Sequence, residues 1–200
     1  MKYRWDIINY LIEKFNYQSY LEIGVDQGQC FRQINLDNKK SVDPAEVRYN
    51  NANPTYKMTS DEFFKINSDI YDIIFIDGLH HSEQVDKDLQ NSLRFLSENG
   101  TIILHDVNPL TELAQRVPRE SGRWNGDVWK SIVRHRLNNK EFGCISIDLL
   151  PNDEGISVIK KSISNAISIE VPDVLSYDWL EKNRTEALGL VNINDFLTIK

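Results

Sequence analysis

The segment 71–77, with the sequence Tyr-Asp-Ile-Ile-Phe-Ile-Asp, constrains the fold more than any other part of the chain. Residues 73–76 are a continuous apolar run without polar alternation. That pattern is typical of a strand buried on both faces, as strands are in a parallel sheet covered by helices. The run is also far shorter than the stretch of about 18 apolar residues that a membrane-spanning helix requires. The segment therefore predicts an interior strand of an α/β protein.

Helical and strand-like patterns alternate around this segment. Apolar residues at helical spacing predict helices over 4–15, 29–36, 59–67 and 82–97. Short apolar runs predict strands over 20–24, 40–43, 71–77 and 101–104. Glu62 is spaced for a capping box at the start of the third helix, and Asn99-Gly100 is spaced to end the fourth. The alternation predicts a mostly parallel central sheet with right-handed crossovers and helices on both faces.

The second half of the chain is less regular. Residues 107–125 read as an irregular, proline-bearing connection, after which Asp127 is expected to cap a helix through about residue 137. Strands are expected near 142–148 and 155–160, a helix over 177–184, and a sheet extension or a wrapping segment over 190–199. We expect one domain over 1–200, with an N-terminal helix in 1–17, a cofactor-binding core in 18–106, a lid and helix in 107–140, and C-terminal strands with an appendage in 141–200.

Composition excludes several classes of protein. Hydrophobic residues make up 40% of the chain and the net charge is −7, which suits a soluble globular enzyme and disfavours nucleic acid as a partner. Cys30 and Cys144 are too few for a disulfide framework and are expected in the core. Glu13 and Lys14 interrupt the apolar stretch 7–12, so no signal peptide is expected. We expect a cytoplasmic protein with no membrane partner; the sequence predicts nothing about its oligomeric state.

Polar residues stand at the end of each predicted core strand. They are Glu22, Asp43, Asp77, His105 and Asp106. In open α/β sheets the ligand site lies outside the carboxyl ends of the strands, so these side chains are expected around one site.

The turn 22–28, Glu-Ile-Gly-Val-Asp-Gln-Gly, follows the first predicted strand. Gly24 and Gly28 allow a close approach of the backbone to a ligand. The turn lacks the middle glycine of the dinucleotide fingerprint and the lysine of a phosphate loop. Asp43 follows Gly24 by 19 residues, where a carboxylate either accepts both hydroxyls of a ribose or caps the loop before Pro44.

Three motifs together resemble the class I S-adenosylmethionine-dependent methyltransferases: residues 21–28, 42–44 and 71–78. The stretches 76–85, 100–106 and 124–130 are similar to a bacterial branch linked to O-methylation of glycans and natural products. The resemblance covers about residues 18–106. It implies a Rossmann-like methyltransferase fold and S-adenosylmethionine as the cofactor. It further implies that cofactor-binding residues are Glu22, Gly24, Gly28, Asp43, Ser60, Asp61 and Asp77, with the methionine end along 22–28, the ribose on Asp43 and the adenine beside Ser60 or Asp61.

Two aspartates form a candidate metal site. Asp77 and Asp106 end neighbouring strands and could share Mg²⁺, which prefers oxygen ligands. Some related O-methyltransferases add a neighbouring Asp or Asn, but here Val107 stands in that position, and Asn108 is one residue late. Whether the enzyme needs a metal stays open at this point.

The histidines are candidates for proton transfer. His80 follows Asp77 in the loop that faces the site, and an imidazole suits removal of a hydroxyl proton. His105 is either a second catalytic histidine or a hydrogen-bond partner of Asp77 or Asp106. His81 and His135 are expected to be structural or solvated.

A basic segment follows the core. Residues 114–140 contain seven basic and two acidic side chains. Lys130, Arg134 and Arg136 fit a solvated helix face. Arg116, Arg119, Arg123 and Trp124 lie in the irregular part, and we hypothesise that they bind an anionic acceptor such as a nucleotide-linked or acidic sugar.

The leading interpretation is methyl transfer to a hydroxyl of a small molecule or sugar. A metal-dependent phosphohydrolase is one alternative, suggested by His80-His81 and His105-Asp106; such hydrolases are helical, whereas His105-Asp106 ends a strand. A non-catalytic module that binds S-adenosylmethionine is another. A nicotinamide enzyme is the weakest alternative because the middle glycine is missing.

Overall fold

The computed structural model describes residues 1–45, 53–149, 153–163 and 167–198. The helices are α1 (Arg4–Phe15), α2 (Gln29–Gln33), α3 (Ser60–Ile66), α4 (Ser82–Arg94), α5 (Glu112–Gln115), α6 (Trp129–Asn138), α7 (Tyr177–Leu188) and α8 (Ile193–Leu197). The strands are β1 (Tyr20–Ile23), β2 (Lys39–Val42), β3 (Tyr71–Ile76), β4 (Leu96–His105), β5 (Gly143–Ile147), β6 (Ile156–Lys160) and β7 (Leu190–Val191).

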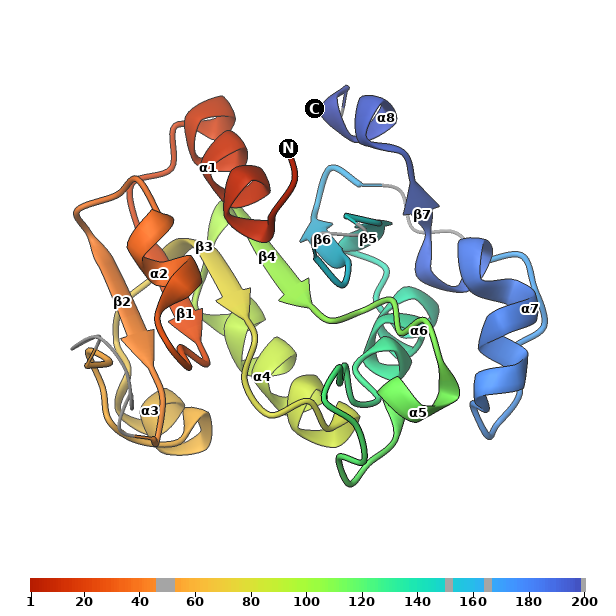
Figure 1. Cartoon of the computed structure of the whole chain (residues 1–200). Helices are drawn as coiled ribbons and strands as arrows, with labels where there is room; N and C mark the ends of the chain where they lie inside the picture. The colour runs from red at the N-terminus through yellow and green to blue at the C-terminus, as the bar shows by residue number, and fades with distance from the viewer. Residues whose placement is uncertain (46–52, 150–152, 164–166, 199–200) are drawn as a thin grey trace.

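These strands form one sheet in the order β2-β1-β3-β4-β6-β5-β7 (Figure 1). The neighbours from β2 to β4 are parallel, β6 is antiparallel to both β4 and β5, and β7 is parallel to β5. Because the four parallel strands end at one edge, the residues that follow them are brought together. The predicted α/β fold with a mostly parallel sheet is confirmed.

Strand β3 shows why its sequence is apolar without interruption. Ile73 and Phe75 are fully buried in the core that α1, α2 and α8 form with one face of the sheet. Ile74 and Ile76 are buried in the second core, which α3, α4, α6 and α7 form with the other face. Alternate residues of a strand point to opposite faces, so a strand between two helix layers must be apolar at successive positions.

The predicted end of the fourth helix is wrong. Helix α4 ends at Arg94, and Gly100 lies inside β4 rather than at a helix terminus. The register between β3 and β4 shifts after Leu96 pairs with Tyr71, and a Cβ on Gly100 would lie 2.7 Å from the Leu96 side chain. The glycine therefore serves the close packing within an irregular strand, which its sequence context does not distinguish from a helix end.

Asp127 caps a different helix from the predicted one. Helix α6 begins at Trp129, with Val128 as its N-cap. The carboxylate of Asp127 instead accepts hydrogen bonds from the Ser82 N–H at 2.7 Å and the Ser82 hydroxyl at 3.1 Å, at the start of α4. Asp127 thereby ties the end of the irregular connection to the loop that carries His80.

The remaining expectations for the second half are largely met. The connection 107–125 contains the short helix α5, which Thr111 caps by accepting from the Ala114 N–H at 3.1 Å. The expected helix over 177–184 is α7, which extends to Leu188. Residues 190–198 provide both the sheet extension and the wrapping segment. Strand β7 extends the sheet, and α8 packs on α1, where the Tyr10 hydroxyl donates to the Leu197 carbonyl at 3.0 Å.

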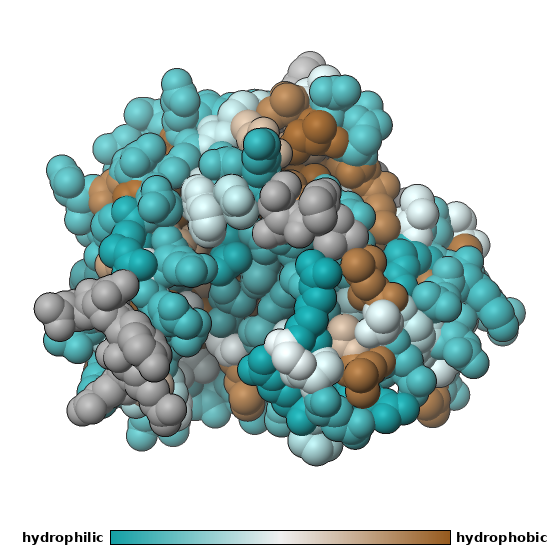
Figure 2. Space-filling view, in the orientation of Figure 1, coloured by the Kyte–Doolittle hydropathy of each residue, from teal (hydrophilic) through white to brown (hydrophobic). Residues whose placement is uncertain are grey.

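The surface and the cysteines fit the composition. Cys30 and Cys144 are buried free thiols, as expected for core residues. In the face shown in Figure 2, hydrophilic side chains predominate. Among the described residues, no helix has the length and apolar character needed to cross a membrane.

Candidate active site

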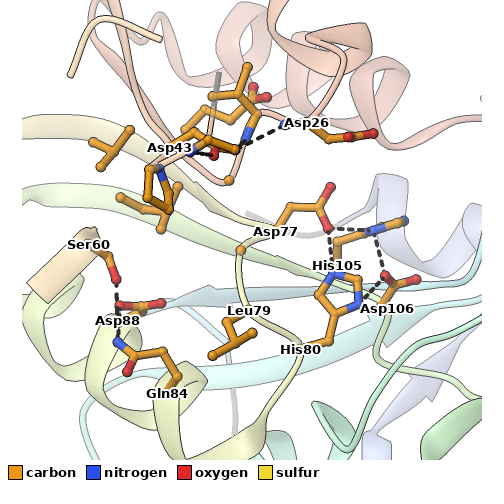
Figure 3. Close-up of a pocket in the computed structure, with 18 of the residues that line it drawn as sticks. Asp26, Asp43, Ser60, Asp77, Leu79, His80, Gln84, Asp88, His105 and Asp106 are labelled. Atoms are coloured by element: carbon orange, nitrogen blue, oxygen red, sulfur yellow. Dashed lines mark hydrogen bonds and ion pairs between the residues drawn. The ribbon is translucent and has the colours of Figure 1, made fainter. Parts of the chain in front are cut away.

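A cavity of about 720 Å³ lies at the carboxyl ends of β1, β2, β3 and β4 (Figure 3). Its lining residues fall into three groups. The first group, at the glycine turn, is Asp26 and Asp43. The second group lies at another end of the cavity and comprises Ser60, Gln84 and Asp88. The third group lies at a third end and comprises Asp77, His80, His105 and Asp106. The position agrees with the rule that open α/β sheets bind ligands beyond the carboxyl ends of their strands.

The glycine turn packs directly on the end of β3. Gly24 has φ +87°, and a Cβ at this position would lie 2.1 Å from the carbonyl oxygen of Asp77. Gly28 has φ +68° and precedes α2. A larger residue at position 24 would therefore displace the β3 loop that carries Asp77 and His80.

Asp43 holds the glycine turn in place. Its Oδ2 accepts from the Val25 N–H at 2.8 Å and from the Asp26 N–H at 3.1 Å, and its Oδ1 accepts from the Ala45 N–H at 2.8 Å. The side chain thus caps the loop and also lines the cavity. A carboxylate offers about four acceptor positions, so these three bonds leave capacity for a ligand.

Glu22 is a buried carboxyl in the cavity wall. Only 1% of the residue is exposed, and the Tyr20 hydroxyl donates a hydrogen bond to it. Burial raises the pKa of Glu22 to about 8, because the charged form loses its hydration. Burial therefore favours the neutral form of this side chain near neutral pH.

Ser60 and Asp61 lie at the second end of the cavity, in the first turn of α3. Thr59 and Glu62 form the predicted capping box. The Nε2 of Gln84 contacts Asp61 Oδ1 at 3.0 Å, Ser60 Oγ at 3.4 Å and Asp88 Oδ1 at 3.1 Å. An amide nitrogen has two hydrogens, so this cluster has more acceptors than donors.

The sequence interpretation missed Gln84 and Asp88. Asp88 is buried, and burial raises its pKa to about 6. The available signal was its position on the apolar face of α4, between Val85 and Leu89, where a polar residue is unexpected.

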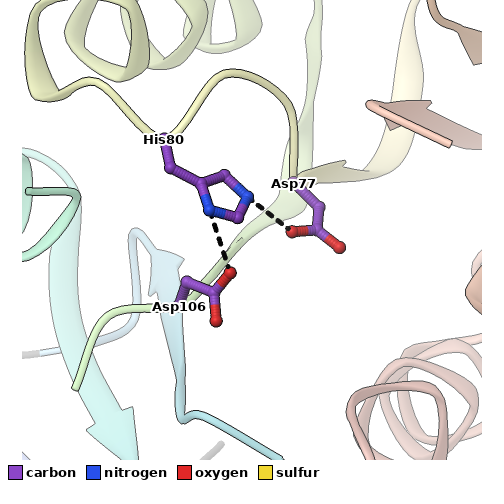
Figure 4. A group of neighbouring side chains, drawn as sticks. All are labelled: Asp77, His80 and Asp106. Atoms are coloured by element: carbon purple, nitrogen blue, oxygen red, sulfur yellow. Dashed lines mark ion pairs between the residues drawn. The ribbon is translucent and has the colours of Figure 1, made fainter. Parts of the chain in front are cut away.

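At the third end, His80 lies between two carboxylates (Figure 4). Its Nε2 is 3.5 Å from Asp77 Oδ1, and its Nδ1 is 3.2 Å from Asp106 Oδ2. Burial disfavours the charged imidazole, but the two carboxylates outweigh it and raise the pKa of His80. Asp106 adopts φ +59°, a conformation unusual for a residue with a side chain, and Asn125 donates to it at 3.2 Å.

His105 is enclosed by carboxylates on both sides. Its Nδ1 is 2.9 Å from Asp77 Oδ1, and its Nε2 is 2.5 Å from Asp153 Oδ1. Burial opposes charge on the ring, yet Asp106 and Asp77 raise the pKa of His105 well above its usual value. The predicted contact of His105 with Asp77 is present, and Asp153 is a partner that the sequence did not indicate.

The sequence and structure comparisons agree with this geometry. Residues 21–107 match the family model described as a methyltransferase domain. The matched stretch runs from β1 to just beyond β4 and includes the glycine turn, Asp43, Asp77 and His80. A search of curated proteins gives no significant match.

Several solved structures share the fold of most of the chain. One is a Staphylococcus aureus protein assigned as a caffeoyl-CoA O-methyltransferase, with TM-score 0.57 and 20% identity over 78% of this chain and 82% of that one. The Bacillus cereus O-methyltransferase in complex with S-adenosylhomocysteine has TM-score 0.55 and 13% identity, over 79% and 80%. The Streptomyces achromogenes O-methyltransferase of tomaymycin synthesis, in complex with S-adenosylmethionine, has TM-score 0.55 and 12% identity, over 79% of each chain.

The cavity has side chains suited to a divalent cation. One ligand atom each from Asp77, His80 and Asp106 lies within 4.8 Å of the others. Two carboxylates and an imidazole fit Mg²⁺ less closely than an all-oxygen set and also suit metals such as Mn²⁺. The sequence suggested Asn108 as a possible third metal ligand. Its Oδ1 instead accepts a hydrogen bond from Arg184 on α7 at 2.7 Å, so His80 is the third candidate ligand.

The basic segment, residues 114–140, is only partly at the cavity. Arg119 and Trp124 line it; the Trp124 ring stacks on His80 with centroids 5.0 Å apart, and Arg119 lies over the same indole at 5.7 Å. Arg116 forms ion pairs with two nearby glutamates, Glu112 at 3.3 Å and Glu120 at 2.9 Å. Arg123 pairs with Glu154. These pairs leave Arg116 and Arg123 outside the cavity lining.

The expectation of a solvated face is wrong for Arg136. Helix α7 packs against α6, and Arg136 is buried between them. Its guanidinium donates to the carbonyl oxygens of Cys144 and Glu186, so it satisfies acceptors near the end of α7. His135 is likewise structural, with Nε2 2.9 Å from the Phe142 carbonyl.

Proposed function

We propose that this methyltransferase transfers a methyl group from S-adenosylmethionine to a hydroxyl oxygen of a small-molecule acceptor. The observation that carries the proposal is a single cavity that joins the glycine turn to the cluster of Asp77, His80 and Asp106. The relatives solved with S-adenosylmethionine or S-adenosylhomocysteine support the choice of cofactor, and their names support oxygen as the acceptor atom.

The cofactor is held by the first two groups of lining residues. Its methionine part would lie along the turn from Glu22 to Gly28, which the missing side chain of Gly24 allows to pack on the end of β3. Asp43 accepts from the ribose hydroxyls with its remaining capacity while it holds the turn. Ser60, Asp61 and Gln84 meet the adenine, whose amino group supplies the donor hydrogens that their acceptor-rich cluster lacks.

S-adenosylmethionine supplies an electrophilic methyl group on a sulfonium that becomes a neutral thioether. The residues of this chain prepare the acceptor. His80 in its neutral form takes the proton from the acceptor hydroxyl, and Asp77 and Asp106 stabilise the imidazolium that results. A divalent cation held by Asp77, His80 and Asp106 would lower the pKa of the same hydroxyl. The two routes make opposite predictions for chelation.

The acceptor lies against Trp124 and Arg119. The indole offers a flat surface for a ring, and the guanidinium at the rim suits a carboxylate or phosphate on the acceptor. We infer an acceptor with a planar or sugar ring and one anionic group. Phosphohydrolysis is not favoured, because residues 21–107 match the model of a methyltransferase domain and His105-Asp106 ends a strand.

Titration of the protein with S-adenosylhomocysteine, followed by turnover with a panel of hydroxyl acceptors, tests the proposal. We expect saturable binding of S-adenosylhomocysteine, and methylated product from acceptors that carry both a ring and an anionic group. Binding without turnover of any acceptor would favour the non-catalytic alternative. An absence of binding would overturn the proposal.

A further inference from the structure

The cavity wall is strongly acidic. Among the described lining residues there are six aspartates and Glu22, against two arginines, Arg4 and Arg119. Arg119 lies at the acceptor side, over Trp124. Arg4 is therefore the arginine that serves the rest of the cavity.

Arg4 is delivered to the site by the N-terminal helix. It is the first residue of α1, and Figure 1 shows that helix beginning near the carboxyl ends of β3 and β4. Its backbone N–H donates to Asp153 Oδ2 at 2.8 Å, and its Nη1 donates to both oxygens of that carboxylate at 3.3 Å. Asp153 thus fixes the guanidinium from the side of the β5–β6 connection.

The guanidinium has a donor to spare. Its Nε is buried and has no hydrogen-bond acceptor within the described part of the chain. Asp77 Oδ2 is 3.7 Å from that atom, which is an ion-pair distance but too long for a hydrogen bond. Because Nε is shielded from solvent, a ligand oxygen would meet the guanidinium at Nη2, which is not buried and has no hydrogen-bond acceptor in the described part of the chain.

The charge of Arg4 acts on the glycine-turn side of the cavity. The positive charge of Arg4 interacts electrostatically with Glu22 at the end of β1 and with Cys30 in α2. Both of these residues line the cavity. The methionine part of the cofactor in the proposed function lies along the turn between these two residues. It carries an ammonium, which an acidic wall favours, and a carboxylate, which the same wall repels.

We propose that Arg4 binds the carboxylate of the methionine moiety of S-adenosylmethionine. The inference rests on the proposed function, because it assumes that this cofactor occupies the cavity. A guanidinium forms paired, charge-assisted hydrogen bonds with a carboxylate, and its positive charge offsets the repulsion from Asp77 and the other acids. Asp153 is the positioning residue that holds Arg4 for this contact.

The test compares two ligands in two proteins. Calorimetry measures the affinity of S-adenosylhomocysteine and of its decarboxylated analogue for the natural protein and for Arg4→Met. The natural protein should bind the analogue about ten- to a hundredfold more weakly, as expected for loss of a charge-assisted contact. Arg4→Met should bind S-adenosylhomocysteine more weakly by a similar factor and should discriminate little between the two ligands.

Equal weakening of both ligands in Arg4→Met would overturn the inference, since Arg4 would then act only by supporting Asp77 and Asp153. Arg4→Lys keeps the charge but not the paired geometry, so it should retain part of the discrimination, and it serves if Arg4→Met does not fold. Arg94→Met, which removes a cation at the distant end of α4, should discriminate as the natural protein does. If the natural protein binds neither ligand, the proposed function fails and not this assignment alone.

Discussion

The Nε2 atom of His105 lies 2.5 Å from the Oδ1 atom of Asp153, although the two residues are separated by 48 positions in the chain. The other ring nitrogen faces Asp77 at 2.9 Å. Because a carboxylate can only accept, both nitrogens of His105 donate, and the ring is an imidazolium. His105 therefore orients Asp77 rather than taking a proton from the acceptor. The pKa of His80 is raised as well, because it lies between Asp77 and Asp106, so the proposed base is the fraction of His80 that is neutral.

This division of roles predicts how activity responds to a change at His80. His80→Ala should lower the turnover rate roughly 10²–10⁴-fold, the usual contribution of a positioned base. Cofactor affinity should change little, because the glycine turn with Asp43 and the cluster of Ser60, Gln84 and Asp88 remain intact. Steady-state rates and calorimetry on the same variant measure the two quantities. A variant with full activity would remove His80 from the reaction.

Chelation separates a metal from a histidine base. If Asp77, His80 and Asp106 hold a divalent cation, dialysis against a chelator should abolish turnover, and Mg²⁺ or Mn²⁺ should restore it. If His80 acts alone, dialysis should leave the rate unchanged. Elemental analysis of the purified protein provides an independent measure of bound metal. Loss of activity that no added metal restores would contradict both routes.

The buried carboxyl of Glu22 predicts a dependence of stability on pH. Its pKa is about 8 in the folded protein and 4.5 ordinarily, so folding favours its neutral form. Its contribution to the free energy of unfolding is fully present below about pH 4.5 and is lost as the pH rises through about 8. Melting temperatures measured from pH 5 to pH 9 should therefore fall less steeply for Glu22→Gln, which cannot ionise, than for the natural protein. Parallel profiles would show that Glu22 is not perturbed.

Asp43 is predicted to act on the ribose beyond its effect on the glycine turn. Asp43→Ala should weaken S-adenosylhomocysteine binding by about 1.5–3 kcal/mol, the range for hydrogen bonds to a charged group. The analogue that lacks the ribose 2′-hydroxyl separates the two effects: the natural protein should prefer the hydroxyl-bearing ligand, and Asp43→Ala should not. Asp37→Ala, an exposed residue before β2, is the control. If Asp43→Ala keeps the preference, Asp43 is a loop cap alone.

The sequence was informative where chemistry follows a buried strand. The apolar run of β3 ends at Asp77, and that of β4 ends at His105 and Asp106, so strand ends in a parallel sheet predicted their proximity. Arg4 and Asp153 carried no such signal. A basic residue at the start of an amphipathic helix and an acidic residue in a connection are ordinary surface features in sequence, and only the tertiary structure brings them together.

The same limit applies to the basic segment, since spacing could not tell which arginine reaches the site. Three candidates lay within eight residues, and ion pairing with local or distant glutamates decides their positions. Arg116 and Arg123 have such partners, while Arg119 donates to the carbonyls of Ser121 and Gly122 and remains at the cavity rim.

The acceptor contact of Arg119 is accordingly the prediction that distinguishes it from its neighbours. Arg119→Met should raise the KM of an anionic acceptor severalfold with little change in cofactor affinity, because the guanidinium is at the acceptor side. Arg116→Met is the matched control, since it removes the same group from the same exposed segment outside the cavity, and its KM should stay unchanged. A neutral analogue of the acceptor should be methylated equally well by Arg119→Met and the natural protein. If Arg119→Met leaves the KM of the anionic acceptor unchanged, the acceptor makes no charge contact at this rim, and the Trp124 surface alone would define its binding.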